Sequence, residues 1–236
     1  MTGFYMAGAL RPAYVGTLQQ GFGGNMSLLD DEIAPRRILI LAAHPAPRRS
    51  VAGKAVRKAA REVDGVTFAD LYAEYPRQDI NADREQERAE AHDVIIFLHP
   101  FFWYSTPSIF KEWQDIVLEH GWAFGSSGKA LAGKIFFSAL TAGNPEESYF
   151  ADGYNHFTLR QMLTPLEQTA DYCGMVYLPP FAFFRAGHAE EGNRLNEHVA
   201  EWKGLLMALR DHKIDIETAR QQPLLNGQLK MLTREA

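Results

Sequence analysis

The chain has 236 residues, of which 46% are hydrophobic and 22% charged, values typical of a folded globular protein. Its formal net charge of -5 argues against the broad basic face on which proteins bind nucleic-acid backbones. No run of apolar residues is long enough to cross a bilayer. The one cysteine, Cys173, can form neither an intrachain disulfide nor a metal-binding pair. These features predict one domain with a sizeable core in a reducing, cytoplasmic setting, with no metal.

Composition divides the chain into three segments. Residues 1–35 mix Gly, Pro and polar residues without the basic start and apolar run of a secretory signal, and we expect a flexible or partner-draped arm. Residues 36–212 carry the periodic patterns of a folded domain. Residues 213–236 lose that periodicity and are interpreted as a C-terminal tail.

Strand and helix patterns alternate through the predicted domain. In chain order we expect a strand at 36–43, a helix at 51–63, a strand at 66–72, a helix ending at 91, a strand at 94–99, a helix at 108–119, a strand at 134–140, a helix at 157–172, a strand at 175–178 and a helix at 188–209. Five such units with right-handed crossovers predict an α/β domain whose parallel sheet is covered on both faces.

In an open parallel sheet, ligands bind beyond the carboxyl ends of the strands, where the strand order reverses. This rule selects the loops after the first, third and fourth strands. They are residues 44–50, 100–107 and 141–156, which we call the first, second and third loops.

The first loop ends at a predicted helix N-terminus, where free backbone N–H groups form an anion site. The Ser50 hydroxyl and the small residues Ala52 and Gly53 would let phosphate oxygens approach, and His44 could add charge. No Walker or G-x-G-x-x-G pattern occurs at this turn, which argues against a Walker-type nucleotide triphosphatase and an ordinary Rossmann dinucleotide-binding site. A plain helix cap is the alternative interpretation of Ser50.

The second loop carries four consecutive aromatic residues, Phe101, Phe102, Trp103 and Tyr104, between two prolines. Four adjacent side chains cannot all enter one core, so some must face solvent or a ligand. A planar heteroaromatic ring would stack well against them. A hydrophobic lid or a dimer contact is the alternative.

The third loop begins with the small residues of Thr141 to Asn144, whose backbone amides could bond the edge of such a ring. Tyr149, Tyr154 and His156 follow, and each could donate a proton to a reduced oxygen. An isolated tyrosine or histidine is more often structural, so both interpretations stay open for these side chains.

Several motifs in consistent order over residues 36–210 resemble one known family. They are His44-Pro45, the helix start at Ser50, His99-Pro-Phe-Phe-Trp-Tyr-Ser105, Lys111 with Trp113, His120-Gly-Trp-Ala-Phe-Gly125, Leu140-Thr-Ala-Gly143 and Tyr172-Cys-Gly-Met-Val-Tyr-Leu-Pro-Pro-Phe181. The chain resembles the flavodoxin-fold NAD(P)H:quinone oxidoreductases, and most closely the ancillary subunits of glutathione-gated potassium efflux systems. The resemblance implies a flavodoxin-like three-layer sandwich with strand order 2-1-3-4-5, and a homodimer with FMN at its interface.

The resemblance also implies roles for matching positions. The phosphate and ribityl chain would be held by His44, Ser50, Val51, Ala52 and Gly53; the flavin ring would be bordered by Phe101, Phe102, Trp103 and Tyr104; and its edge would be bonded by Thr141, Ala142, Gly143 and Asn144. His156 matches an active-site histidine of the family, and Tyr149 lies near a family tyrosine. Ala142, Asn144 and Gly53 depart from the usual residues, and we expect the Ala142 methyl to crowd a bond to the flavin and weaken FMN affinity.

These observations predict an NAD(P)H dehydrogenase (quinone) with a ping-pong cycle, in which NAD(P)H and a quinone-type acceptor use one site over FMN in turn. The alternative is a regulatory subunit on the cytoplasmic face of a potassium efflux transporter, with or without redox activity of its own. A flavin-free relative that keeps the fold as a scaffold is the third hypothesis.

Overall fold

The computed structural model describes residues 33–233, so the predicted arm lies outside the described residues except for 33–35. The sheet contains β1 (Ile38–Ala42), β2 (Val66–Asp70), β3 (Val94–Pro100), β4 (Ile135–Thr141), β5 (Val176–Tyr177) and β6 (Phe181–Phe183). All pairings are parallel, in the order β2-β1-β3-β4-β5, and β6 also pairs with β4. The predicted flavodoxin-like α/β fold with strand order 2-1-3-4-5 is confirmed.

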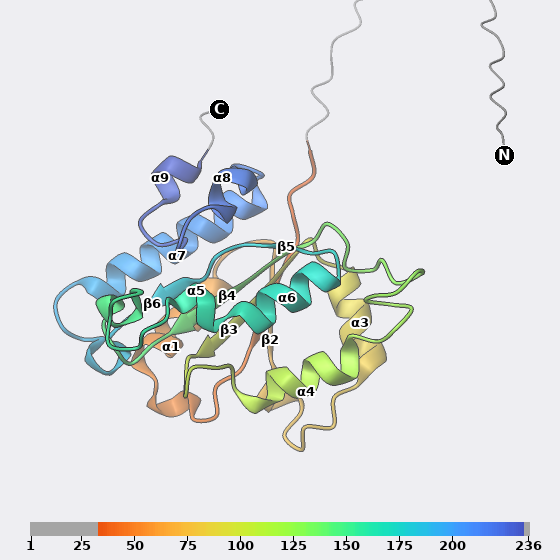
Figure 1. Cartoon of the computed structure of the whole chain (residues 1–236), viewed down its shortest axis with the longest axis horizontal. Helices are drawn as coiled ribbons and strands as arrows, with labels where there is room; N and C mark the ends of the chain where they lie inside the picture. Colours follow the sequence, from red (N-terminus) through yellow and green to blue (C-terminus); the bar gives the residue numbers. More distant parts are fainter. Residues whose placement is uncertain (1–32, 234–236) are drawn as a thin grey trace, which may run out of the picture. The chain divides into compact units, whose positions relative to one another are not determined.

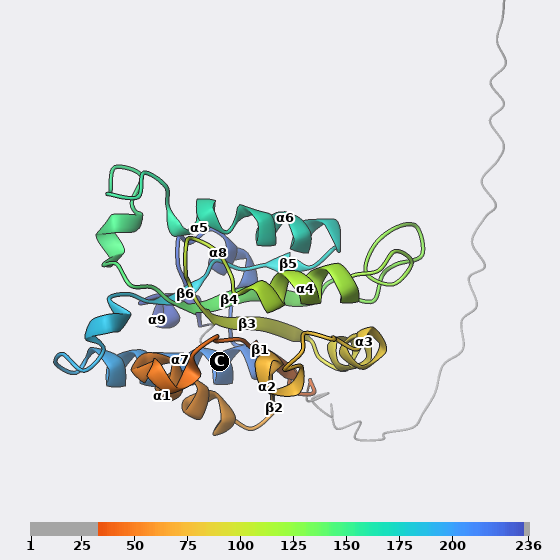
Figure 2. The same cartoon turned by 90° about the horizontal axis from the view of Figure 1, so that it is seen from below.

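Helices cover both faces of this sheet. Figures 1 and 2 show α1 (Val51–Arg61) and α7 (Arg194–Arg210) on one face, and α4 (Ser108–Val117) and α6 (Thr164–Tyr172) on the other. α3 (Ala82–Glu90) packs beside α4, and the short α2 (Leu71–Glu74) directly follows β2. Every residue of β1, β3 and β4 is buried, which explains why these strands read as continuous apolar runs.

Alternate residues of each strand enter two separate cores. In β1, Ile38 and Ile40 belong to the cluster that contains Trp202 of α7, whereas Leu39 and Leu41 belong to the cluster that contains Trp113 of α4. Because side chains alternate along a strand, one run of aliphatic residues serves both layers. This arrangement holds the carboxyl ends of the central strands at one edge of the sheet.

The fifth strand is broken by Pro179 and Pro180, which have no N–H to donate to the sheet. β5 pairs with the start of β4, and β6 resumes the pairing with Ala139 to Thr141. The predicted strand at 175–178 therefore covers only the first part, and β6 was missed. A proline also divides the predicted helix at 157–172 into α5 (Leu159–Met162) and α6, since Pro165 stands in the first turn of α6.

Other element boundaries also differ from the prediction, and two of these differences have a local structural reason. The predicted strand at 66–72 ends at Asp70, because Leu71 begins α2. The predicted helix at 188–209 begins at Arg194, after a short 3-10 turn at Ala186–His188.

Residues that we treated as a tail are packed on the domain. They form α8 (Ile216–Arg220) and α9 (Leu229–Leu232), which lie beside α7 in Figure 1. Ile214, Ala219, Leu225 and Leu232 are buried in the core on the α7 side. The helices have only five and four residues, too few to produce a periodic pattern in the sequence.

This C-terminal segment covers the free edge of β6. The Asn226 side chain accepts from the Ala182 N–H at 2.7 Å and donates to the Ala182 carbonyl at 3.0 Å. The Leu225 N–H donates to the Pro180 carbonyl at 3.0 Å. Both backbone groups of Ala182 are therefore paired although β6 has no further strand on this side.

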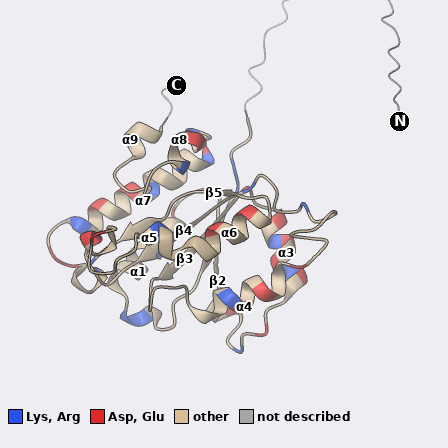
Figure 3. Ribbon diagram, in the orientation of Figure 1, with Lys and Arg blue, Asp and Glu red and all other residues tan. Residues whose placement is uncertain are grey.

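Surface charge is mixed. Figure 3 shows acidic and basic residues interspersed along the helices in this view. Among residues 33–233, no helix combines the length and apolar character that membrane crossing requires.

We expect Asn226→Ala to lower the free energy of unfolding by about 1–3 kcal/mol, because it leaves two buried backbone groups of Ala182 without partners. Urea unfolding measures the change. Asn196→Ala, the same substitution at an exposed position of α7, serves as the control and should change stability by less than about 0.5 kcal/mol. Equal losses for the two variants would contradict the edge-covering role.

Candidate functional site

The second and third loops meet in a cleft of about 310 Å³, lined by Phe101, Phe102, Trp103, Tyr104, Gly143, Asn144 and Tyr149. Its volume lies within the range of small-molecule sites. The first loop adjoins it, because the His44 ring makes an edge contact with Phe102 at a centroid distance of 5.7 Å. The three loops selected from the sequence therefore come together at the carboxyl edge of the sheet.

The four aromatic residues of the second loop divide between core and surface, as predicted. Phe101 is buried and packs near Tyr149 at a centroid distance of 6.2 Å. Phe102 and Tyr104 are about half exposed, and Trp103 is 93% exposed. The loop thus presents three aromatic side chains to solvent beside the cleft.

A tight turn in the second loop exposes these aromatic side chains. The Ser105 N–H donates to the Phe102 carbonyl at 3.1 Å, and the two residues between them are left-handed, with φ of 50° at Trp103 and 62° at Tyr104. Left-handed backbone costs a non-glycine residue about 1–2 kcal/mol. Such strain collects at ligand sites, where the surrounding structure enforces it.

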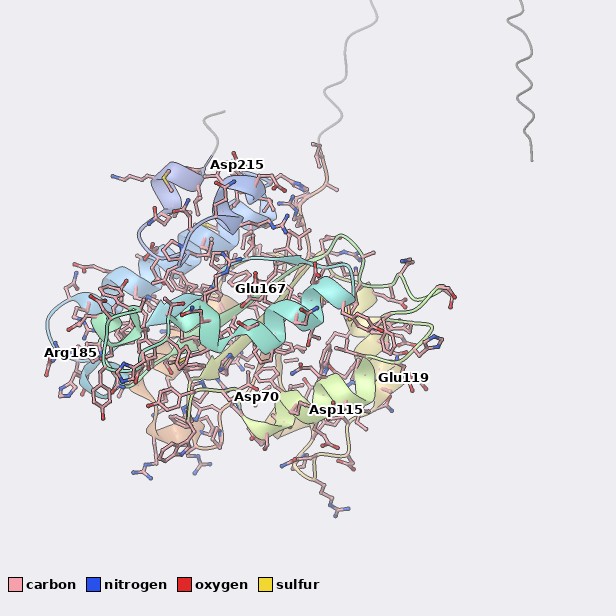
Figure 4. The ribbon with its side chains drawn as sticks, viewed as in Figure 1. Asp70, Asp115, Glu119, Glu167, Arg185 and Asp215 are labelled. Carbon is pink, nitrogen blue, oxygen red and sulfur yellow. The ribbon has the colours of Figure 1, made fainter. Side chains whose placement is uncertain are left out.

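His156 and Arg185 are also left-handed, with φ of 60° and 52°. Of the six described non-glycine residues with positive φ, four therefore lie on or beside the loops around the cleft. Figure 4 shows Arg185 at the end of the domain where β6 runs into the α7 connection.

The start of α1 offers free hydrogen-bond donors. The Ser50 hydroxyl caps the helix by accepting from the Gly53 N–H at 3.0 Å. The N–H groups of Val51 and Ala52 have no acceptor among residues 33–233, so they are available to an anion. A Cβ at Gly53 would lie 2.6 Å from the Ser50 hydroxyl oxygen, which explains glycine at this position.

His44 adds a further donor. Its Nδ1 accepts from the Ala46 N–H at 3.0 Å, so the neutral ring carries its proton on Nε2. Burial is the main cause that lowers the pKa of His44, and the charge of Arg57 acts in the same direction while Asp70 opposes it. A neutral His44 can donate one hydrogen bond to a bound oxygen.

Some backbone N–H groups of the third loop bond within the fold, and others are free beside the cleft. The Ala142 N–H donates to the Phe183 carbonyl at 2.9 Å, and its methyl group is fully buried. The Ala142 N–H is therefore used by the fold, and Ala142 is not among the residues that line the cleft; its contact with a flavin stays a prediction. The Thr141 carbonyl accepts from the Phe101 N–H at 2.8 Å and joins the second loop to the third.

Gly143 and Asn144 line the cleft, and their N–H groups have no acceptor among the described residues. A Cβ at Gly143 would meet no atom within 4 Å, so the space beside it is open. These two amides can reach the edge of a bound ring.

The two predicted catalytic residues differ in burial and in whether they line the cleft. Tyr149 ends a 3-10 turn at Glu146–Tyr149, lines the cleft and packs between Phe101 and Phe184. Burial raises the pKa of the Tyr149 hydroxyl, which keeps it protonated as a donor. His156 is exposed and is not among the residues that line the cleft.

Asn155 is a site residue that the sequence analysis missed. It is buried, and its Oδ1 accepts from the Tyr104 hydroxyl at 3.3 Å, which ties the third loop to the strained turn. Its buried Nδ2 has no partner among the described residues. No periodicity or charge pattern distinguishes this asparagine from its neighbours, so the sequence carries no signal for it.

The set of groups fits a phosphorylated planar ring. An aromatic border and two free amides surround the cleft, and further free amides with the His44 Nε2 donor lie beside it at the start of α1. Within the described part of the chain, no group of three His, Cys, Asp or Glu residues is arranged to hold a metal ion.

Residues 36–206 match the family described as having a flavodoxin-like fold. The chain belongs to this family. One relative, the glutathione-regulated potassium-efflux system ancillary protein KefG of Pectobacterium atrosepticum, is 43% identical over 152 residues, 64% of this chain and 83% of the relative.

Two solved structures of this fold are informative. General stress protein 14 of Treponema denticola, in complex with FMN, is 36% identical, with a TM-score of 0.69 over 73% of this chain and 99% of its own. An NADPH-quinone reductase from P. pentosaceus is 27% identical, with a TM-score of 0.65 over 72% of this chain and 97% of its own.

His99, at the end of β3, predicts a pH dependence of stability. It is fully buried, its Nδ1 bonds the Pro100 carbonyl at 3.0 Å, and burial lowers its pKa from 6.5 to about 4. The unfolded chain binds a proton near pH 6.5 and the folded chain does not, so stability falls as the pH drops from 6.5 towards 4.

We expect this residue to contribute a loss of about 2 kcal/mol between pH 7 and pH 5. Urea unfolding at both pH values measures the loss of stability. The loss in His99→Gln should be about 2 kcal/mol smaller than the loss in the parent. His188→Gln, at an exposed position, should behave like the parent. The same pH dependence in the parent and in His99→Gln would refute the assignment.

Proposed function

We propose that the protein is an FMN-dependent NAD(P)H dehydrogenase (quinone). The observation that carries the proposal is the aromatic cleft of the second and third loops beside the unpaired amides of α1. A flavin ring suits the cleft, and its phosphate suits the helix start. The Treponema relative that binds FMN and the P. pentosaceus quinone reductase support this function.

Different groups of residues would bind different parts of FMN. The amides of Val51 and Ala52, with His44 Nε2, hold the phosphate. The amides of Gly143 and Asn144 bond the ring edge. Phe102, Trp103 and Tyr104 border the ring and exclude water.

Bound FMN supplies two-electron transfer between NAD(P)H and the acceptor, which alternate on the open side of the cleft. In the net reaction, NAD(P)H loses a hydride and becomes NAD(P)⁺. The quinone gains that hydride equivalent and one proton from solvent, and leaves as the hydroquinone.

Tyr149 is suited to assist at the acceptor oxygen, because its hydroxyl stays protonated within the cleft. We propose that Tyr149 donates a hydrogen bond to the developing oxyanion. His156, exposed on the same loop, would support the developing oxyanion or supply a proton.

We expect Tyr149→Phe to lower the rate of quinone reduction about 100-fold, with FMN content unchanged, because the donor is lost while the ring remains. His156→Ala should cause a smaller loss, within about tenfold. Stopped-flow measurement of the two half-reactions separates the effects. Tyr154→Phe, at a side chain that is 80% exposed and does not line the cleft, is the control. A Tyr149→Phe protein that retains FMN and reduces quinone at the parent rate would exclude the proposed role.

We also propose a homodimer. Large aromatic side chains are exposed on both loops that border the cleft and directly after the third loop, namely Phe102, Trp103, Tyr104, Phe150, Tyr154 and Phe157. Apolar surface of this kind is characteristic of interaction sites. Sedimentation velocity of the purified protein tests this assembly, and a monomer at all concentrations would exclude it.

The likeness to KefG favours a second candidate function. In this alternative the protein is a regulatory subunit in the cytoplasm, bound to a potassium efflux transporter at the membrane, with or without redox activity. Co-purification with such a transporter and altered potassium efflux on deletion would support it. Rapid quinone turnover without a transporter partner would favour the enzyme alone.

A further inference from the structure

A second cavity lies across Tyr149 from the cleft. We call it the C-terminal groove; it has a volume of about 370 Å³, and its apolar wall is made by Tyr149, Phe150, Leu159, Phe184, Pro223 and Leu224. Tyr149 and Phe150 belong to the third loop, and Pro223 and Leu224 to the segment between α8 and α9. The groove is therefore closed on one side by residues outside the family match at 36–206.

Hydrogen bonds hold that outer wall in place. Arg160 Nη1 donates to the Arg220 carbonyl at 2.7 Å, and Arg160 Nη2 bonds Glu167 Oε1 at 2.7 Å. Glu167 lies on α6, as Figure 4 shows. At the far end of the segment, Asn226 is fixed on Ala182. The wall is thus anchored to two separate elements of the domain.

Packing adds to this anchoring. Leu224 contacts the core on the α4 and α6 side, whereas Leu225 is buried in the core on the α7 side. Adjacent residues therefore straddle the edge of the sheet at β6. The groove is a formed part of the domain.

The groove suits a hydrocarbon chain. Its surface is mostly apolar, with Leu159 and Phe184 buried. None of the residues that line it has a buried polar side-chain atom without a partner. A ligand in this groove therefore needs no matching hydrogen-bond groups, and binding would be driven by burial of apolar surface.

Tyr149 lines both the groove and the cleft, so a single side chain lies between them. NAD(P)H and FMN carry phosphates, which this groove does not suit: its one lining cation, Arg160, already bonds Glu167 and the Arg220 carbonyl, and the lining carboxylate of Glu146 would repel a phosphate. A lipid quinone combines a redox ring with a hydrocarbon chain. We propose that the C-terminal groove binds the apolar side chain of a quinone whose ring reacts in the cleft, an inference that rests on the proposed function.

A ring-matched pair of acceptors tests this inference with the FMN-loaded, full-length protein. The pair is 2,3-dimethoxy-5-methyl-1,4-benzoquinone and its 6-decyl derivative. Each fully buried methylene contributes about fourfold in affinity. We therefore expect the decyl quinone to have a KM at least about tenfold lower than the ring alone, since even partial burial of the chain reaches this ratio.

Two variants direct the test to the groove wall. Leu224→Gln and Pro223→Asp should reduce the KM ratio of the two quinones to less than about threefold, while turnover of the ring alone stays unchanged. Met231→Gln, on the following helix α9, is the control, because Met231 is exposed and does not line the groove. Pro223 is exposed, so its replacement addresses the wall even if Leu224→Gln proves unstable.

A binding measurement separates the groove from the redox function. The protein is labelled with a fluorophore on Gln221→Cys, at the rim of the groove, and titrated with 1-decanol. The label attaches to position 221 because the native Cys173 is buried and burial raises the pKa of its thiol. We expect saturable binding that Leu224→Gln weakens at least about tenfold.

The outcomes are distinguishable. Saturable decanol binding without turnover of either quinone would retain the groove as an apolar site but refute its role in quinone reduction together with the proposed function. Turnover of both quinones with equal KM values, and no saturable decanol binding, would overturn the groove while the proposed function stands. A shift from dimer to monomer in Leu224→Gln would also overturn it, because a second copy would then fill the groove.

Discussion

The pairing of β3 with β4 is the constraint on which the site depends. It runs over seven residue pairs and continues past the strands through the bond from the Phe101 N–H to the Thr141 carbonyl. This last bond brings the second and third loops together at one edge of the sheet. From there Phe101 turns into the core, Trp103 turns out, and Gly143 and Asn144 face the space between the loops.

Strain at this edge has to be offset by the rest of the fold. Two consecutive left-handed aromatic residues cost roughly 2–4 kcal/mol together, a large share of the roughly 5–15 kcal/mol by which domains are stable. Burial of Phe101 and the bond from Tyr104 to Asn155 hold the turn in place. The same turn exposes Trp103, which buries little of its surface against the described chain and is therefore suited to a binding role.

Much of this arrangement was predictable because buried parallel strands have a strong signature. Ile38 to Ala42 and Val94 to Leu98 are apolar on both faces, and the rule for parallel sheets then selects the correct loops. Orientation within a loop was not predictable. Ala142 faces the core and Gly143 faces the cleft only because the bond from Ala142 to Phe183 fixes the backbone between them.

Features that depend on distant contacts were missed. β6 follows two prolines and exists because β4 offers it a partner. Asn155 matters through Tyr104, which lies 51 residues away along the chain. The segment from Ile214 to Leu232 packs through isolated apolar residues and short helices, so its place in the core has no periodic sequence pattern.

The central claim is that the first loop and the aromatic cleft form one site for a phosphorylated ring. Comparison of FMN with riboflavin in a fluorescence titration tests it most directly, since the two ligands differ only in the phosphate. Two or three charge-assisted bonds from Val51, Ala52 and His44 should make FMN bind at least about 100-fold more tightly. Equal affinities for FMN and riboflavin would contradict a single site shared by the start of α1 and the cleft.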